Sequence, residues 1–286
     1  MISSAKLVKP SIEYMNSFIE ACREFAKVNP EYDVFQGEIP TPERIDKLLK
    51  QYEDQSRGIG LPKGWVPSTT FWLVDGDEYI GSGNIRHALT EHLKQFGGHI
   101  GYNIRPSKWG LGYGTWQLKL LLPEAAKLGI RYALITCSSR NIASRRVIEK
   151  NGGVYIDCVK NIYNGQEWPT LRFRVDTGLK EGSLYTSGEP WYHGSNMKFD
   201  TLLPGSTITQ WRELAEAFSH KPSLLEYDDD KAIRHNGTQP GYLYVIDEPI
   251  VPGDDIYIHP RSAMDQAYEW LTVRPLKLRL IAELPV

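Results

Sequence analysis

Three alternating glycines, Gly110, Gly112 and Gly114, constrain this chain more than any other feature of its sequence. They lie in Ile104-Arg-Pro-Ser-Lys-Trp-Gly-Leu-Gly-Tyr-Gly-Thr-Trp, where a strand pattern ends and an apolar helix pattern begins. Glycine accepts a positive φ and lets a ligand approach the backbone closely. A glycine loop that leads into a helix N-terminus directs N–H groups and the positive end of the helix dipole to one spot. The stretch therefore predicts a phosphate or pyrophosphate site.

The spacing of these glycines excludes two common nucleotide loops. A Walker loop needs Lys-Ser/Thr after its last glycine, and none follows Gly114. A dinucleotide loop needs a third glycine at the position of Gln117. A flexible turn without any ligand stays open as the alternative when the loop is considered alone.

Periodic apolar residues predict regular elements on both sides of the loop. Helices are expected over residues 11–27, 41–51, 113–128 and 141–151, and strands over 69–74, 79–85, 99–105, 132–137, 154–159 and 170–175. Thr41 as cap and Pro42 in the first turn predict the start of the second helix. Pro123 falls inside the third helix, where it costs about 3 kcal/mol, so we expect a kink or an early end there.

The loop resembles the pyrophosphate loop of GNAT acetyltransferases, Arg/Gln-x-x-Gly-x-Gly/Ala. Gly112 and Gly114 match its small positions, and Trp109 stands where the family prefers Arg or Gln. Arg105 or Lys108 would then supply the charge. Further segments look like one bacterial subgroup of these enzymes: Val66-Pro-Ser-Thr-Thr-Phe-Trp-Leu-Val, Gly83-Asn-Ile-Arg-His, Gly97-Gly-His-Ile-Gly-Tyr-Asn-Ile-Arg-Pro-Ser and Asn141-Ile-Ala-Ser-Arg-Arg-Val-Ile-Glu-Lys-Asn-Gly-Gly. The resemblance covers residues 6–176. It implies an α/β GNAT fold with a mixed, mostly antiparallel central sheet, and acetyl-CoA as cosubstrate.

The resemblance also implies the site residues. The expected cofactor contacts are Asn103, Ile104, Arg105, Trp109, Gly110, Leu111, Gly112, Tyr113, Gly114, Thr115, Asn141 and Ser144. In such enzymes an amine attacks the thioester directly. The pKa of a primary amine is about 10, as for a lysine side chain, so a base must first remove a proton. His99 and His87 are the candidate bases, although each could be an ordinary strand-end histidine. The tyrosine acid of the family would fall at Val147 or Ile148, so the thiolate leaves unassisted or takes its proton from Tyr102 or a water.

Breaker residues divide the chain in two. Asp176-Thr-Gly-Leu-Lys-Glu-Gly-Ser and Ser187-Gly-Glu-Pro predict a domain at 1–178, a linker at 179–189 and a second domain at 190–286. Strand patterns at 242–246, 255–259 and 276–281 make the second domain β-rich, of the α+β type.

The second domain opens on Trp191-Tyr-His-Gly-Ser, which resembles ADP-ribosyltransferases of the rifampicin-modifying type. The resemblance implies a smaller ADP-ribosyltransferase-like fold and an NAD site formed by His193, Gly194, Ser219 and Glu269. Ala217 departs from the family, which places a stacking tyrosine there, so one wall of that pocket is missing.

Composition argues against several kinds of binding partner. Among 286 residues, 33 Lys and Arg stand against 35 Asp and Glu, so a broad basic surface for nucleic acid is not expected. The sequence has no apolar run of membrane length and no signal-peptide pattern, which favours a cytoplasmic protein without a membrane partner. Cys22, Cys137 and Cys158 lack metal-ligand spacing, so no metal is expected. Cys137 and Cys158 lie in apolar runs and are expected to be buried thiols.

The sequence thus predicts an N-acetyltransferase that moves acetyl from acetyl-CoA to a primary amine of a small molecule or protein. Two alternatives stay open. The C-terminal domain could be the active half as an NAD-dependent ADP-ribosyltransferase, or the chain could sense CoA and bind a partner without catalysis. The acceptor is not identified by the sequence, and a homodimer is compatible with the resemblance because GNAT dimers are common.

Overall fold

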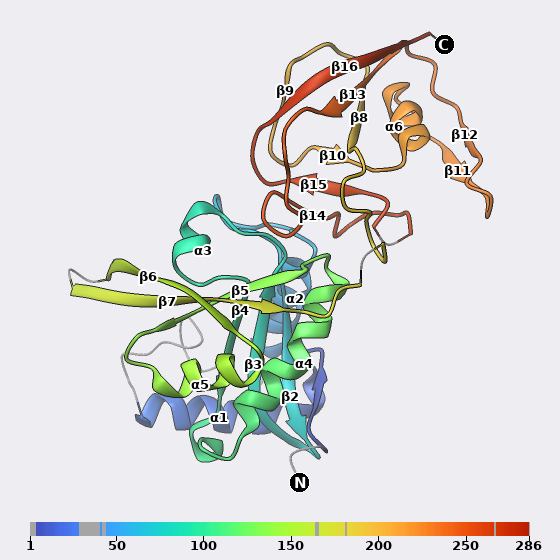
Figure 1. Ribbon diagram of the computed structural model, residues 1–286. Helices are drawn as coiled ribbons and strands as arrows, with labels where there is room; N and C mark the ends of the chain where they lie inside the picture. The colour runs from blue at the N-terminus through green and yellow to red at the C-terminus, as the bar shows by residue number, and fades with distance from the viewer. Residues whose placement is uncertain are drawn as a thin grey trace. The chain divides into compact units, whose positions relative to one another are not determined.

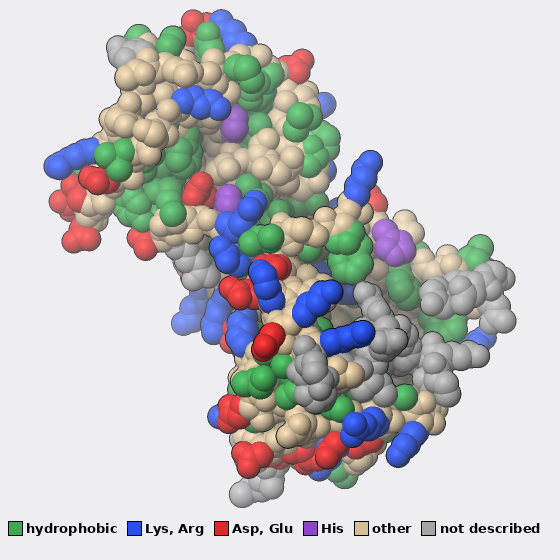
Figure 2. Space-filling view, turned by 180° about the vertical axis from the view of Figure 1, so that it is seen from behind, with side chains coloured by type: hydrophobic (Ala, Val, Ile, Leu, Met, Phe, Trp, Pro, Cys, Tyr) green, Lys and Arg blue, Asp and Glu red, His purple; other side chains and the backbone are tan. Residues whose placement is uncertain are grey.

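The computed structural model describes residues 4–28, 41, 44–163, 166–180, 182–265 and 267–285. It divides into two compact units, Met1–Leu179 and Lys180–Val286 (Figure 1). Over the face shown in Figure 2, Lys and Arg side chains lie among Asp and Glu side chains. Within the described ranges, every helix is too short or too polar to cross a lipid bilayer.

The first unit contains two antiparallel sheets. The first has the order β1 (Lys6–Val8), β2 (Ser68–Asp75), β3 (Glu78–Arg86) and β4 (Ile100–Ile104). The second has the order β5 (Tyr132–Ser138), β7 (Gln166–Asp176) and β6 (Val154–Tyr163). The expectation of one mixed central sheet was therefore wrong, because all these ladders are antiparallel and no ladder among the described residues joins β4 to β5.

One residue explains why the pairing stops between β4 and β5. His99 N–H donates to Leu134 O at 2.7 Å, as in a ladder, but Leu134 N–H donates to the imidazole Nδ1 of His99 at 3.0 Å. A side chain has taken the place of the backbone carbonyl that would continue the ladder. Beside this contact the two sheets meet in one isolated bridge, between Gly98 and Ile135.

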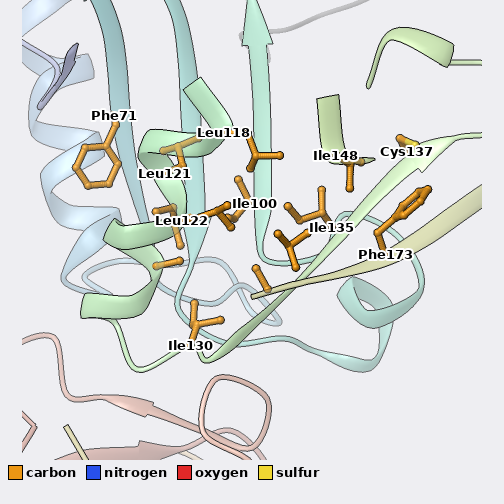
Figure 3. Close-up of a cluster of buried hydrophobic side chains, with 14 residues drawn as sticks. Phe71, Ile100, Leu118, Leu121, Leu122, Ile130, Ile135, Cys137, Ile148 and Phe173 are labelled. Atoms are coloured by element: carbon orange, nitrogen blue, oxygen red, sulfur yellow. The ribbon is translucent and has the colours of Figure 1, made fainter. Parts of the chain in front are cut away.

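The helices of the first unit are α1 (Met15–Val28), which follows a 3-10 turn η2 (Ile12–Tyr14), α2 (Ile45–Ser56), α3 (Glu91–Gln95), α4 (Tyr113–Lys127), which follows a second 3-10 turn η4 (Pro106–Lys108), and α5 (Ile142–Lys150). The strand β2 is buried on both faces because its side chains alternate between two layers of helices. Trp72 packs with Phe18 of α1, at 4.6 Å between stacked ring centroids. Phe71 points to the other core, which α4 and α5 cover with Leu118, Leu121 and Ile148 (Figure 3).

Most local predictions for this unit are confirmed, including the β2–β3 hairpin and a helix after Gly112 that closes at Gly129. The second helix runs to Ser56, and its predicted start at Pro42 lies outside the described residues. The early end at Pro123 was wrong, since α4 continues to Lys127. The short helix α3 was not predicted.

The prediction for the cysteines was half right. Cys137 is buried, but Cys158 is exposed. Because β6 is the edge strand of the second sheet, apolar residues on it have a neighbour on one side only. Exposed Val154 and Ile162 on the same strand show the same effect.

The second unit is β-rich, as expected. One sheet has the order β8 (Tyr192–Ser195), β13 (Gly241–Ile246), β16 (Leu276–Leu284) and β9 (Thr201–Leu202), and another has the order β10 (Thr207–Ile208), β15 (Trp270–Thr272) and β14 (Ile256–Ile258). A hairpin of β11 (Leu225–Tyr227) and β12 (Ile233–His235) lies beside the helix α6 (Arg212–Ser219) (Figure 1). Trp191 and Trp270 pack edge to face in its core, at 5.3 Å between centroids.

Candidate functional site

The glycine loop has the backbone that a pyrophosphate site requires. Gly110 and Gly112 have φ of 76° and 91°, in the left-handed region that glycine adopts without strain. Gly112 is the N-cap of α4 and offers no side-chain cap, and the first helical bond runs from Trp116 N–H to Gly112 O at 3.2 Å. The N–H groups of the first turn of α4, which come before Trp116, therefore point out of the helix end and have no acceptor within the helix.

Gly114 has a different task from its two neighbours. A Cβ at this position would lie 3.3 Å from Cγ2 of Val147 on α5. The glycine thus lets α4 and α5 pack closely behind the loop. The sequence grouped the three glycines together, whereas the structure separates two turn glycines from one packing glycine.

The basic side chains beside the loop are already paired with carboxylates. Arg105 is 5% exposed, donates from Nε and Nη2 to Glu24, and donates from Nη1 to Glu78 at 3.1 Å. Lys108 Nζ lies 2.6 Å from the other oxygen of Glu78. Their charges are therefore compensated within the protein, and the loop offers an anion its N–H groups and helix dipole.

Glu24 connects this loop to α1. Its second carboxylate oxygen accepts from Ser107 N–H at 3.0 Å, so one side chain holds both Arg105 and the backbone of η4. Partial burial opposes ionisation, but the bonds from Arg105 and Ser107 outweigh it and lower the pKa of Glu24. Sequence reasoning missed Glu24 because nothing local links residues that lie 81 positions apart.

Of the other predicted residues around the loop, Trp109 and Leu111 lie at the surface, whereas Tyr113 and Thr115 are bonded to other parts of the first unit. Trp109 and Leu111 are exposed at its surface, and Trp109 Nε1 donates to Ile104 O at 2.5 Å. Tyr113 is turned away, since its hydroxyl donates to Asp75 at 2.8 Å. Thr115 O accepts from the side chain of Asn151 at 3.2 Å.

On β4, Asn103 and Ile104 can offer a ligand mainly their backbone. The Asn103 amide is occupied by Ser82 of β3, accepting from its N–H at 3.2 Å and donating to its hydroxyl at 3.0 Å. The Ile104 side chain lies over Gly81, where a Cβ would approach its Cδ1 to 3.0 Å.

Tyr102, Ser144 and Asn141 form a group that spans β4 and the start of α5. The Tyr102 hydroxyl lies 3.0 Å from Ser144 Oγ and 3.3 Å from Ser144 O. Asn141 caps α5, because its Oδ1 accepts from Ser144 N–H at 2.9 Å. Burial raises the pKa of Tyr102, so this phenol keeps its proton at neutral pH.

Both candidate bases are buried. His99 is 1% exposed, and its Nδ1 accepts the Leu134 N–H described above. His87 is 4% exposed and lies 2.8 Å from Thr69 Oγ1 through Nε2, and burial lowers its pKa to about 4. The structure therefore gives each imidazole a hydrogen-bond partner inside the protein, Leu134 N–H for His99 and Thr69 Oγ1 for His87.

In the second unit, the residues predicted for NAD lie around α6 and β8. His193 Nδ1–H donates to Thr207 O at 2.7 Å, and burial lowers the pKa of His193. A Cβ on Gly194 would lie 1.7 Å from Ala215 O and 2.9 Å from Ser219 N, so only glycine fits against α6. Glu269 accepts a hydrogen bond from the Ser262 hydroxyl. His193, Gly194 and Ser219 are thus adjacent, while Glu269 adjoins the neighbouring strand β15.

The described residues contain no group of three or more His, Cys, Asp or Glu side chains that could hold a metal ion.

Comparison with known proteins gives a clear family match and weaker structural similarities. Residues 11–154, half of the chain, match the model of the acetyltransferase (GNAT) domain. RimL, a ribosomal L7/L12 α-N-protein acetyltransferase solved with coenzyme A, is 17% identical, with a TM-score of 0.47 over 62% of this chain and 97% of its own. The microcin C7 self-immunity acetyltransferase MccE, solved with acetyl-CoA and AMP, is 15% identical, with a TM-score of 0.46 over 60% and 92%.

A Salmonella typhimurium acetyltransferase that modifies the N-terminal serine of ribosomal protein L7/L12 is 18% identical, with a TM-score of 0.44 over 61% of this chain and 95% of its own. No curated protein sequence gives a significant match.

Proposed function

The chain belongs to the GNAT family of acetyltransferases, and we propose that it transfers acetyl from acetyl-CoA to a primary amine by direct attack. The observation that carries the proposal is the loop at the start of α4, where Gly110 and Gly112 hold positive φ and the N–H groups of the first turn lack helical acceptors. Such a helix end binds a diphosphate without needing a basic side chain.

In this proposal the pyrophosphate of CoA lies against the loop and the pantetheine follows β4. The expected contacts are the backbone of Asn103, Ile104 and Arg105, the loop residues Trp109 to Thr115, and Asn141 and Ser144 at the start of α5. The paired charges of Arg105 and Lys108 support a binding mode that relies on the backbone. These two side chains then fix the loop rather than bind phosphate.

The chemistry needs one nucleophile, one oxyanion site and one proton donor. The amine nitrogen attacks the thioester carbonyl carbon, the C–S bond breaks, and the amine loses a proton to water or a base. Backbone N–H groups of β4 between Tyr102 and Ile104 stabilise the oxyanion. Tyr102, whose hydroxyl lies 3.0 Å from Ser144 Oγ, gives a proton to the CoA thiolate and takes one back from solvent.

The acceptor is a primary amine of a small molecule or of another protein. The enzyme itself works as a monomer or as a homodimer. An acetyl-transfer assay with a panel of amines, detecting the released CoA thiol, tests the proposal. Wild type should release CoA with at least one amine. Tyr102→Phe should lower kcat about tenfold or more with little change in the KM for acetyl-CoA. Unchanged kcat in this variant would remove Tyr102 from the mechanism.

A second candidate function is NAD-dependent ADP-ribosyl transfer by the second unit. The observation behind it is that Gly194 lies against Ser219 of α6 and that the neighbouring His193 imidazole is held by Thr207 O. Stabilisation of the chain by NAD, lost in His193→Ala, would support this activity. Binding of acetyl-CoA without turnover of any amine would support a non-catalytic CoA sensor.

A further inference from the structure

Three aromatic side chains of the second unit form a corner on its surface. Trp211 precedes α6, Tyr227 ends β11, and Tyr268 precedes β15. Their ring centroids lie 5.1–5.7 Å apart, and each pair is inclined by 65–86°. The three rings contact one another edge to face, and all three are half-buried rather than buried. We call this cluster the aromatic corner.

A cation of the protein already lies over the aromatic corner. Lys231 Nζ is 5.3 Å from the ring centroid of Tyr268 and 5.7 Å from that of Trp211. Both distances are within the range of a cation–π interaction. Lys231 is itself exposed, so its ammonium contacts the rings from the solvent side and is not enclosed by them.

Backbone strain is concentrated around the aromatic corner. Among the described residues other than glycine, positive φ occurs at Lys221, Lys231 and Ala267. Two of these three flank the corner, with φ of 61° at Lys231 and 71° at Ala267, next to Tyr268. Strain of this kind persists where surrounding structure enforces it, and it is concentrated at ligand sites.

The corner is also held rigidly. The Tyr227 hydroxyl donates to Asp265 Oδ2 at 3.0 Å and accepts from Asp265 N–H at 3.1 Å, which fixes one ring. Asp228 Oδ1 accepts the N–H groups of Asp230 and Ala232, at 3.1 and 2.9 Å, which fixes the turn that carries Lys231. The rings are therefore preorganised, while the cation above them is on an exposed and flexible side chain.

We propose that the aromatic corner is a binding site for the organic ammonium group of a ligand, and that Lys231 occupies the site when the ligand is absent. The recognising chemistry is the negative ring faces of Trp211 and Tyr268, with the acidic turn at Asp228 attracting the cation. The site belongs to the second unit alone and does not depend on acetyl transfer, so each proposal can fail without the other.

Ligand-observed NMR with the full chain tests this site. Choline is compared with its neutral isostere 3,3-dimethyl-1-butanol, and n-butylammonium represents a primary amine. The ring faces should shift the ligand protons upfield, and choline should bind about threefold or more tighter than the isostere. Tighter binding of n-butylammonium than of choline would identify a primary amine as the ligand class, and the reverse a quaternary one.

Two variants decide whether the corner is responsible. Lys231→Gln removes the internal competitor and should tighten ammonium binding about threefold. Trp211→Leu should abolish the preference for the cation, whereas Trp65→Leu, at a half-exposed tryptophan of the first unit, should leave it intact. Equal binding of choline and its isostere in the folded Lys231→Gln protein would overturn the proposal.

Discussion

Burial decides what each polar side chain of the first unit can do. His99 and His87 have the residue type of a general base, but both are buried, and one ring nitrogen of each is engaged inside the protein, by Leu134 N–H and by Thr69 Oγ1. Tyr102 is half-buried, close to Ser144, and keeps its proton. We therefore propose Tyr102 as the proton donor to the thiolate, and a structural role for both histidines.

Replacing His99 separates a structural role from a catalytic one. His99→Ala leaves Leu134 N–H without an acceptor and should lower the free energy of unfolding by about 1–3 kcal/mol. His99→Asn restores an acceptor at nearly the same place, so it should keep both stability and acetyl transfer. Denaturant unfolding and the CoA-release assay measure the two effects. A loss of about 100-fold in turnover in both variants would instead identify His99 as the base.

His87 predicts how stability changes with pH. Its folded pKa of about 4 is below the unfolded value near 6.5, so the unfolded chain binds a proton first as the pH falls. The neutral form thus contributes stability that is fully present above pH 6.5 and decreases by about 3 kcal/mol towards pH 4. Urea unfolding at several pH values measures this slope.

The matched variant is His87→Gln, which can still bond Thr69 but does not titrate. Its unfolding free energy should lack the part of the slope between pH 6.5 and 4. An equal slope in both proteins would show that other groups cause the acid sensitivity.

At the scale of elements, the glycine loop works because other elements hold it. Glu24 of α1 bonds both Arg105 and Ser107, and Glu78 of β3 bonds Arg105 and Lys108. Because of these bonds the loop is already ordered before CoA binds. Without them, the loop would lose conformational entropy on binding, and the affinity for CoA would fall.

Glu24→Gln should therefore raise the KM for acetyl-CoA about fivefold or more while changing kcat little, since the variant weakens loop order and leaves the reacting groups in place. Steady-state kinetics with varied acetyl-CoA measures this split. Glu13→Gln, on the turn that precedes α1, is the control and should behave as wild type. A fall in kcat at constant KM would contradict the role given to Glu24.

The sequence predicted those parts of the fold that depend on local pattern. The β2–β3 hairpin, the start of α5 near Asn141 and the closure of α4 at Gly129 all follow from residues within a few positions of each other. What it missed depends on distant partners. Cys158 is exposed because β6 is an edge strand, and Arg105 is paired because Glu24 lies 81 residues away in sequence.

The candidate site shows the same division. The backbone of the loop could be predicted, since positive φ at Gly110 and Gly112 follows from the glycines themselves. The roles of the side chains could not be predicted from the sequence, because the bonds of His99 to Leu134 and of Asn103 to Ser82 depend on which strands are adjacent.

Two units share one chain, and we assign acetyl-CoA binding to the first unit. Thermal unfolding of the full chain with acetyl-CoA tests this assignment, with Gly112→Val as the matched variant. At about 100 times its Kd, acetyl-CoA should add about 2.7 kcal/mol to the stability of the unit that binds it. Valine is strained at the φ of 91° found for Gly112 and obstructs the helix end, so the variant should show little of this gain. No stabilisation of wild type, or an equal gain in Gly112→Val, would contradict the binding of acetyl-CoA at this loop.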